Sequence, residues 1–241
     1  MIPKKIHYIW LGGNKKPKII KKCMKSWKRF CPDYEIIEWT ENNFDFSDCK
    51  YAVEAYQNKK WAFVSDYIRY VVLYNEGGVY LDTDVELLKP IDDLLAEHAF
   101  MGFETKSRLN PGLICGSEAG DKFIKRMIDS YKKDSFVLYG GGLNFKTICL
   151  RTTELLQKDG LILDGSEQTV DGIKLYPTEY FNPMNMDTGK INKTKNTYSI
   201  HRYAASWCSK KARLRGKIYQ LIAKIFGVKF AEKVRNRIKS K

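Results

Sequence analysis

The sequence lacks closely spaced cysteines. Six cysteines occur among 241 residues, at positions 23, 31, 49, 115, 149 and 208, and no two of them form a Cys-x-x-Cys pair. Zinc clusters and disulfide frameworks are built from regularly spaced cysteines, so neither is indicated. Reduced thiols are typical of a cytosolic protein.

Long apolar runs are missing as well. A membrane-spanning helix needs about 20 consecutive apolar residues, and no stretch of this chain reaches that length. The first five residues lead directly into a short apolar segment, Ile6 to Trp10, without the pattern of a signal peptide. Internal repeats and low-complexity tracts are absent too. We therefore expect one α/β domain in the cytosol, because this length can bury a substantial core.

Acidic residues are nearly absent from the end of the chain. Residues 209–241 contain twelve Lys or Arg against one acid, Glu232, so that +11 of the total charge of +14 lies in this tail. Apolar residues recur there at helical spacing on both sides of Gly227; they are Leu214, Ile218, Leu221, Ile222, Ile225, Phe230, Val234 and Ile238. Basic amphipathic helices bind anionic membrane surfaces. The alternative is a pair of helices that pack on the domain with a solvated basic face.

The sequence does contain a pair of carboxylates directly after an apolar run. Val79-Tyr80-Leu81 precedes Asp82-Thr83-Asp84, which predicts a strand that ends in two aspartates. Residues two apart in a strand point to the same face. The two carboxylates would then lie side by side and suit Mg²⁺ or Mn²⁺ held jointly with a phosphate. A surface turn with two solvated aspartates is the alternative.

A strongly apolar helix is predicted just before this pair. Apolar and aromatic residues recur at helical spacing over 61–74, and the run closes on Gly77-Gly78. Asp66 and Arg69 lie three apart on one face of this helix. They are either an ordinary intrahelical ion pair, worth about 0.2–0.5 kcal/mol, or buried charges that require partners.

These segments resemble a known family of enzymes. Ser65 to Arg69 and Gly77 to Asp84 look like the signature of glycosyltransferases with a DXD sugar-binding motif, and the likeness continues through Ile6 to Trp10 and His201 to Trp207. This group, of the family 32 type, is related to yeast initiation-specific mannosyltransferases and bacterial capsular polysaccharide transferases. It is more distantly similar to the glucosyltransferase domain of large clostridial toxins. The resemblance covers roughly the first 208 residues.

The resemblance implies roles for the carboxylates and for the pair in the helix. Asp84 would ligate the metal, and Asp82 would contact the ribose and the donor sugar and take part in the metal site. Asp66 and Arg69 would hold the sugar and orient it for attack. His201 would complete the metal site, since neutral imidazole is a competent ligand for Mn²⁺; the family often has two histidines here, and Arg202 takes the second place.

Four further residues are candidates for binding the donor. Trp10 ends the first predicted strand, where open α/β sheets place ligands, and the resemblance puts it beside the nucleotide base; a tryptophan in the core is the alternative. Asn110 lies in a predicted turn and serves either the donor sugar or the turn itself. Ser206 and Trp207 can each donate a hydrogen bond to a diphosphate oxygen.

The expected fold is a glycosyltransferase-A type, Rossmann-like α/β domain over residues 1–208, followed by a basic amphipathic helical tail over 209–241. The expected activity is metal-dependent, retaining transfer of a hexose from a nucleotide diphosphate sugar, with a UDP-hexose favoured, to a glycan or lipid-linked glycan in the synthesis of a bacterial surface polysaccharide. The tail would hold the enzyme on the cytoplasmic face of the membrane. No residue can be assigned as the catalytic base.

Two other classes of protein fit parts of the sequence. A haloacid-dehalogenase-type phosphatase also runs from a strand into Asp-x-Asp, but its motif usually has Thr or Val where Glu86 stands, and normally lies near the N-terminus. A nucleic-acid-binding protein would use the basic tail for phosphate contacts. The tail does not alternate basic with stacking aromatic residues, and such a role leaves the Asp-x-Asp unexplained, so no nucleic-acid partner is expected.

Overall fold

A computed structural model describes residues 1–206 and 209–239. Helices and strands alternate along the first part of the chain, and two helices end it. The elements are β1 (Lys5–Ile9), α1 (Lys18–Phe30), β2 (Glu35–Trp39), α2 (Lys50–Gln57), α3 (Trp61–Glu76), β3 (Gly78–Tyr80), β4 (Val85–Leu87), a 3₁₀ helix (Asp92–Ala96), β5 (Ala99–Thr105), β6 (Arg108–Leu109), β7 (Cys115–Ser117), α4 (Lys122–Lys132), α5 (Ile148–Gln157), β8 (Gln168–Val170), β9 (Ile173–Tyr176), α6 (Thr178–Phe181), β10 (Ser199–His201), α7 (Lys210–Phe226) and α8 (Val228–Lys239).

The central sheet has the strand order β2-β1-β3-β7-β5-β9-β8, with β6 beside β5. β1 pairs in parallel with β2 and β3, and β5 pairs in parallel with β9, whereas β7 runs antiparallel between β3 and β5. Five strands (β2, β1, β3, β5 and β9) therefore share one direction. The predicted Rossmann-like α/β fold with a mostly parallel sheet is confirmed, and β7 runs antiparallel within it.

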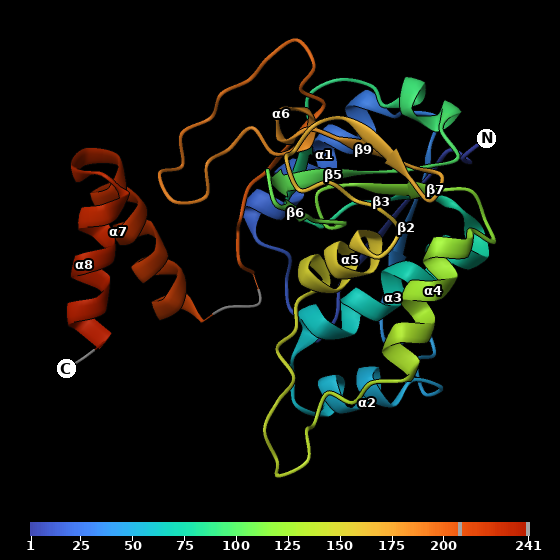
Figure 1. Cartoon of the computed structure of the whole chain (residues 1–241), viewed down its shortest axis with the longest axis horizontal. Helices are drawn as coiled ribbons and strands as arrows, with labels where there is room; N and C mark the ends of the chain where they lie inside the picture. Colours follow the sequence, from blue (N-terminus) through green and yellow to red (C-terminus); the bar gives the residue numbers. More distant parts are fainter. Residues whose placement is uncertain (207–208, 240–241) are drawn as a thin grey trace.

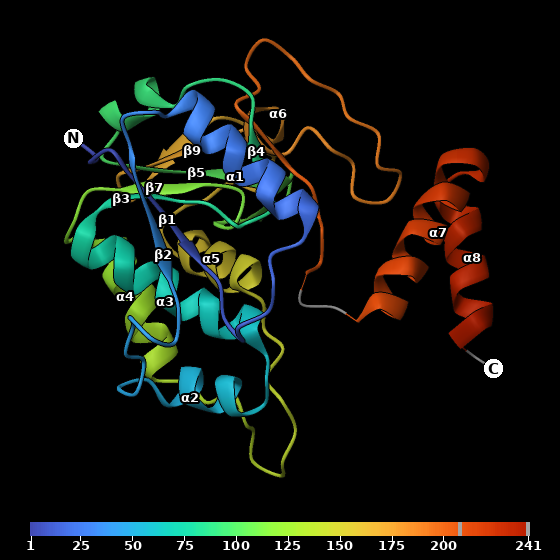
Figure 2. The ribbon, with the colours of Figure 1, turned by 180° about the vertical axis from the view of Figure 1, so that it is seen from behind.

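Helices cover both faces of this sheet, as Figures 1 and 2 show. Side chains alternate between the two faces of a strand. Ile6 and Tyr8 of β1 accordingly pack with Trp27 of α1 on one face, while Ile9 packs with Tyr67 of α3 on the other. Two buried apolar layers thus hold the sheet rigidly between α1 and α3, and the strand ends are fixed where the candidate site lies.

A small second sheet connects the middle of the chain with its late segment. β4 pairs antiparallel with β10, so that His201 lies opposite Val85. The indole N–H of the fully buried Trp27 donates to the carbonyl of Val85 at 2.8 Å and fixes β4 against α1. This pairing brings residues near 84 and 201 together, although more than a hundred residues separate them along the chain.

The last two described helices form a hairpin beside the main body (Figures 1 and 2). We call α7 and α8 the helical hairpin. Ser209 caps α7 by accepting a hydrogen bond from the backbone N–H of Ala212, which is the usual role of serine at this position. Of the helices in the described part of the chain, none is both long and apolar enough to cross a membrane.

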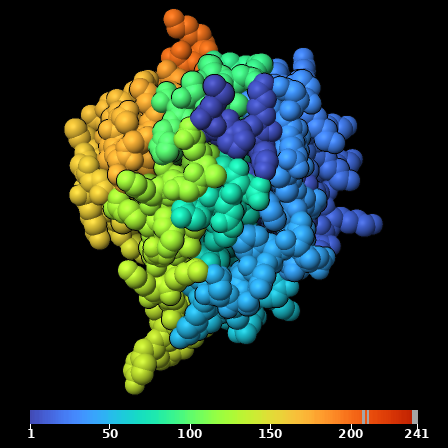
Figure 3. All heavy atoms as spheres, turned by 90° about the vertical axis from the view of Figure 1, so that its right-hand side faces the viewer, coloured from blue at the N-terminus to red at the C-terminus, as the bar shows by residue number. Residues whose placement is uncertain are grey.

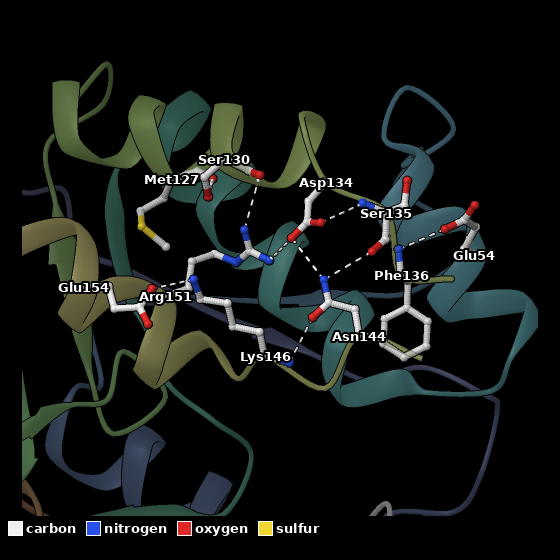
Figure 4. Close-up of polar contacts among 10 residues, drawn as sticks. All are labelled: Glu54, Met127, Ser130, Asp134, Ser135, Phe136, Asn144, Lys146, Arg151 and Glu154. Carbon is white, nitrogen blue, oxygen red and sulfur yellow. Dashed lines mark hydrogen bonds and ion pairs between the residues drawn. The ribbon is translucent and has the colours of Figure 1, made fainter. Parts of the chain in front are cut away.

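A narrow arm, residues 137–143, projects from the main body (Figure 3). Val137 and Leu143 form an isolated antiparallel bridge, and Tyr139 at the tip is fully exposed. A polar network fixes the base of the arm (Figure 4). In it, Asp134 accepts from Arg151 at 2.5 Å and from Asn144 at 3.1 Å, and Glu54 accepts two backbone N–H groups, of Phe136 and Val137, at 2.9 Å each.

Candidate active site

The two aspartates lie in a turn, so the prediction of a strand that ends in carboxylates is wrong in its local geometry. β3 ends at Tyr80, and the backbone N–H of Val85 donates to the carbonyl of Asp82 at 2.9 Å to close the turn. The alternative of two solvated aspartates is wrong as well, since the side chains of Asp82 and Asp84 are only 29% and 14% exposed. The turn directs both carboxylates inward.

His201 completes a cluster with these aspartates. One ligand atom from each of Asp82, Asp84 and His201 lies within 4.8 Å of the others. His201 Nε2 is 3.1 Å from one oxygen of Asp84, and the backbone N–H of Ala204 donates to the other oxygen at 2.7 Å. The side chain of Arg202 pairs with Glu86, so a single histidine takes part in the cluster.

The two partners of the buried ion pair stabilise each other's charges. Burial alone would raise the pKa of Asp84, but the charge of His201 and the donated hydrogen bonds hold it below its ordinary value. Burial alone would lower the pKa of His201, and the Asp84 carboxylate instead raises it. Asp84 is therefore a permanent anion at neutral pH, as a metal ligand must be.

The backbone after His201 is strained. Tyr203 and Ala205 adopt left-handed conformations, with φ of 46° and 45°, which cost energy for residues other than glycine. This course of the chain turns the N–H of Ala204 toward Asp84. Strain of this kind collects at functional sites, but the sequence gives no sign of it.

Asp66 and Arg69 belong to the same site as the turn. Arg69 Nη2 lies 2.9 Å from Asp66 and 3.3 Å from Asp82, so the guanidinium bridges helix α3 and the Asp-x-Asp turn. Its plane lies over the ring of Tyr80, 4.4 Å from the centroid, and the hydroxyl of Tyr80 donates to Asp82 at 2.9 Å. The pair is thus more than an intrahelical ion pair.

The carboxyl group of Asp66 lies in an unusual environment. Burial raises its pKa to about 7, and the nearby charge of Arg69 offsets only part of that effect. The guanidinium of Arg69 stays charged, because neighbouring Tyr80, Asp82 and Asp66 more than offset its own burial and raise its pKa. Perturbed groups of this kind are typical of functional sites.

A glycine in the loop before β7 leaves room for Asp82. A Cβ atom added to Gly112 would lie 2.1 Å from Oδ2 of Asp82. The side chain of Asn110 holds this loop, because its oxygen accepts from the N–H of Gly112 at 2.8 Å and its amide donates to Glu104 at 3.1 Å. Asn110 therefore stabilises the turn through its side chain and also lines the cavity described next.

All the described candidates border one open cavity of about 1110 Å³. Trp10 is half-buried there, and its indole N–H donates to the carbonyl of Asn14 at 2.7 Å. It also packs against the core cluster that contains Tyr8 and Trp27, so it both borders the cavity and contributes to the core. Ser206 also borders the cavity. Trp207 lies outside the described residues.

Several lining residues were not predicted from the sequence. Glu104 stands close to the cluster and pairs with Arg108 at 3.1 Å, and the hydroxyl of Tyr203 lies 3.5 Å from it. Residues of the helical hairpin also line the cavity, among them Arg213, Tyr219 and Arg235. Glu104, Arg108 and the hairpin residues follow no motif, because tertiary contacts alone bring them to the site, whereas Tyr203 lies in the segment from His201 to Trp207 without having been predicted as a lining residue.

The cluster suits a divalent cation. Two carboxylates and one imidazole offer oxygen and nitrogen ligands, a combination that Mn²⁺ accepts and that Mg²⁺ accepts less readily at nitrogen. The absence of a side chain at Gly112 gives the Asp82 carboxylate space at the cluster. The residues present therefore fit the metal that the resemblance implies.

Comparison with known proteins finds a family match in part of the chain. Residues 17–101 match the family described as "Glycosyltransferase sugar-binding region containing DXD motif". The resemblance seen in the sequence is thereby confirmed for this region. The match contains α3 and the Asp-x-Asp turn, but neither His201 nor the helical hairpin.

Among individual relatives, inositol phosphoceramide mannosyltransferase 3 of Schizosaccharomyces pombe is 28% identical over 159 residues, covering 61% of this chain and 44% of that protein. The initiation-specific alpha-1,6-mannosyltransferase of Candida albicans is 32% identical over 127 residues, covering 48% of this chain and 32% of that protein. The chain thus spans less than half of either relative.

A solved structure, that of a glycosyltransferase involved in the glycosylation of the major capsid of PBCV-1, matches over 90% of this chain and 99% of its own. The TM-score is 0.47 and the identity 10%. A likeness at this level carries no argument about the site.

Proposed function

We propose that the protein is a metal-dependent glycosyltransferase that moves a hexose from a nucleotide diphosphate sugar to an acceptor hydroxyl. The observation that carries the proposal is the convergence of Asp82, Asp84 and His201 at one cavity, with Arg69 bonded to Asp82. The family match supports the sugar-binding role of this region. Trp10, on the cavity wall, is a suitable platform for the base.

The bound metal would act as a Lewis acid that neutralises the leaving diphosphate. Asp82, Asp84 and His201 would hold it, and Ser206, which lines the cavity, would donate a hydrogen bond to a diphosphate oxygen. Arg69, whose guanidinium lies over the ring of Tyr80, would fix the orientation of Asp82 toward the sugar. Asp66, protonated in part at neutral pH, can donate a hydrogen bond to a sugar hydroxyl as well as accept one.

We further propose that the acceptor is a glycan or lipid-linked glycan at the cytoplasmic face of the membrane, in the assembly of a surface polysaccharide such as a bacterial capsule. Four apolar residues of α7 support this: Leu214, Ile218, Leu221 and Ile225 are 49–62% exposed. Their spacing puts them on one face of the helix, and basic residues flank them. An apolar stripe within a basic helix suits an anionic membrane surface.

A screen of nucleotide sugars tests the activity. Wild-type protein with Mn²⁺ is incubated with UDP-hexoses, UDP-N-acetylhexosamines and GDP-mannose, the last because the two relatives above are named as mannosyltransferases. We expect thermal stabilisation and slow hydrolysis with one donor, since binding to the native state raises its apparent stability. Our expectation of a UDP-hexose is wrong if GDP-mannose alone is bound, and the glycosyltransferase proposal fails if none is.

A further inference from the structure

The helical hairpin forms one wall of the cavity. Arg213, Gly216, Tyr219 and Gln220 of α7 and Arg235 of α8 all line it. Hydrogen bonds hold this wall to the body, since the hydroxyl of Tyr219 donates to Asp187 at 3.4 Å and the amide of Gln220 donates to the carbonyl of Met186 at 2.8 Å. Typical ligand pockets measure about 300–1,000 Å³, and this open cavity of about 1110 Å³ exceeds that range.

The faces of α7 have different surroundings. Arg213, Gly216 and Gln220, at helical spacings of three and four, point toward the cavity. The apolar stripe of Leu214, Ile218, Leu221 and Ile225 stays exposed on another face. The apolar stripe that we assign to the membrane therefore lies on a different face of α7 from the residues that border the cavity.

The wall carries two arginines without an acidic partner. No carboxylate of residues 1–206 or 209–239 forms an ion pair with Arg213 or Arg235, whereas Arg69, Arg126 and Arg151 each have at least one. The guanidinium of Arg235 lies over the ring of Tyr219, 4.9 Å from its centroid. Stacking fixes its plane and leaves its N–H groups for another ligand.

The two arginines stand along the helical hairpin. At a rise of about 1.5 Å per residue, Tyr219 lies roughly 9 Å along α7 from Arg213, and Arg235 lies over the ring of Tyr219. Both arginines line the same cavity as Ser206, the residue that we propose for the donor diphosphate. Guanidinium groups bind phosphate oxygens in a bidentate manner.

We propose that Arg213 and Arg235 bind a phosphate group of the acceptor, so that the substrate is a phosphate-linked glycan or lipid; this inference rests on the proposed function. The helical hairpin then has two tasks. Its apolar stripe contacts the membrane, and its cavity face receives the anionic headgroup that the membrane presents. The acceptor hydroxyl would thereby approach the donor sugar held at Asp66 and Arg69.

A binding experiment tests the proposal. Full-length protein, saturated with Mn²⁺ and a nucleoside diphosphate, is titrated with a hexose 1-phosphate, with the neutral methyl hexoside and with inorganic phosphate. We expect the hexose phosphate to bind at least about tenfold more tightly than the hexoside, because charge-assisted hydrogen bonds to phosphate are stronger than neutral ones; tenfold corresponds to about 1.4 kcal/mol. The variant Arg213→Gln/Arg235→Gln should lose this preference, whereas the control Arg215→Gln/Lys233→Gln, which removes equal charge from the same helices outside the cavity, should keep it.

Three outcomes would overturn the proposal. Equal losses in both double variants would indicate general charge attraction. Weaker binding of the nucleoside diphosphate in Arg213→Gln/Arg235→Gln would assign the arginines to the donor. Inorganic phosphate that binds as tightly as hexose phosphate would indicate a site for the free anion. These titrations measure binding without turnover. Failure of this inference can therefore be distinguished from failure of the proposed activity, which the donor screen tests.

Discussion

Asp84 has both a chemical and a structural role. Its carboxylate accepts from His201 and from the N–H of Ala204, and its carbonyl accepts from the N–H of Arg202 at 2.9 Å. We expect Asp84→Asn to reduce transfer at least about 10³-fold, as for loss of a group that stabilises the transition-state charge, while costing only about 1 kcal/mol of stability. The small cost follows because an amide oxygen can still accept from Ala204.

The measurement compares donor turnover and the thermal shift produced by Mn²⁺, with the exposed Asp45→Asn as control. The variant should lose both turnover and the Mn²⁺ shift, and its melting temperature without metal should change little. Full activity in Asp84→Asn would remove the metal site from this position.

Gly112 gives a second prediction at the scale of single residues. In Gly112→Ala the new methyl group would meet Asp82 at 2.1 Å and must displace its carboxylate. We expect loss of Mn²⁺ binding with the overall fold kept, because the clash involves a side chain at the cavity. Gly142→Ala is the matched control, since nothing lies within 4 Å of its Cβ position. Unchanged Mn²⁺ affinity in Gly112→Ala, measured by calorimetry, would contradict the role given to Asp82.

Asp66 makes stability depend on pH. Its pKa is raised to about 7 in the folded protein by burial, from an ordinary value of 3.8. The folded state therefore binds the proton more tightly, so this stabilisation is complete below the ordinary pKa and is lost as pH rises to about 7. We expect Asp66→Asn, which does not titrate, to lack that decline, and the difference from wild type should change by up to about 1.4 kcal/mol per pH unit.

Urea unfolding at pH 5, 6, 7 and 8 gives this comparison. Other groups also make the free energy of unfolding depend on pH, and Asp84 does so with the opposite sign. Their contributions cancel when the free energy of unfolding of the variant is subtracted from that of the wild type. Parallel stability profiles would show that the environment of Asp66 does not raise its pKa.

At the scale of elements, the arm at 137–143 depends on buried polar contacts at its base (Figure 4). The side chain of Arg151 is 8% exposed and pairs with Asp134, whereas the Lys146–Glu154 pair nearby is 36% and 44% exposed. We expect Arg151→Met to destabilise the protein by about 2–3 kcal/mol, since it leaves a partly buried carboxylate unpaired. Lys146→Gln should cost at most about 1 kcal/mol, as is usual for exposed pairs.

Limited proteolysis and urea unfolding measure this difference. Cleavage within the arm should be faster in Arg151→Met than in Lys146→Gln, because the base of the arm opens more often. Equal stability and equal cleavage of the two variants would show that the network does not anchor the arm.

The elements also show how far the sequence could predict the site. Helix α3, with Asp66 and Arg69, and the position of Asp82 and Asp84 follow from local periodicity and spacing. The turn that carries the aspartates could not be derived in this way, because Leu81 continues the apolar run as a strand residue would. The pairing of β4 with β10, which brings His201 to Asp84, is a long-range contact, and the sequence suggested it only through the family resemblance.

At the scale of the whole molecule, the position of the helical hairpin was beyond prediction. The spacing of Leu214, Ile218, Leu221 and Ile225 indicates an apolar face but does not say whether the face is covered. That the hairpin lines the cavity depends on contacts such as Tyr219 with Asp187, between residues without periodic relation. The predicted boundary between a domain over 1–208 and the tail over 209–241 stays a prediction. The contact of the hairpin with a membrane also stays a prediction.

Deletion of residues 209–241 tests that contact. The deletion removes the exposed apolar stripe and most of the net charge, so we expect the truncated protein to lose binding to vesicles that contain anionic lipid. Binding of the full chain should weaken as salt rises, because exposed charges are screened over about 8–10 Å near physiological ionic strength. Sedimentation with anionic and with neutral vesicles measures both effects.

Hydrolysis of the donor by water, measured on the same truncated protein, shows whether the hairpin serves acceptor binding or belongs to the folded core. The metal cluster and the residues assigned to the sugar all precede residue 209, so the truncated protein should still hydrolyse the donor while transfer to a phosphate-linked acceptor is lost. Precipitation of the truncated protein or loss of donor binding would instead make α7 and α8 part of the folded core. The exposed stripe on α7 would then have a structural explanation, and the argument for a membrane-bound acceptor would lose its support.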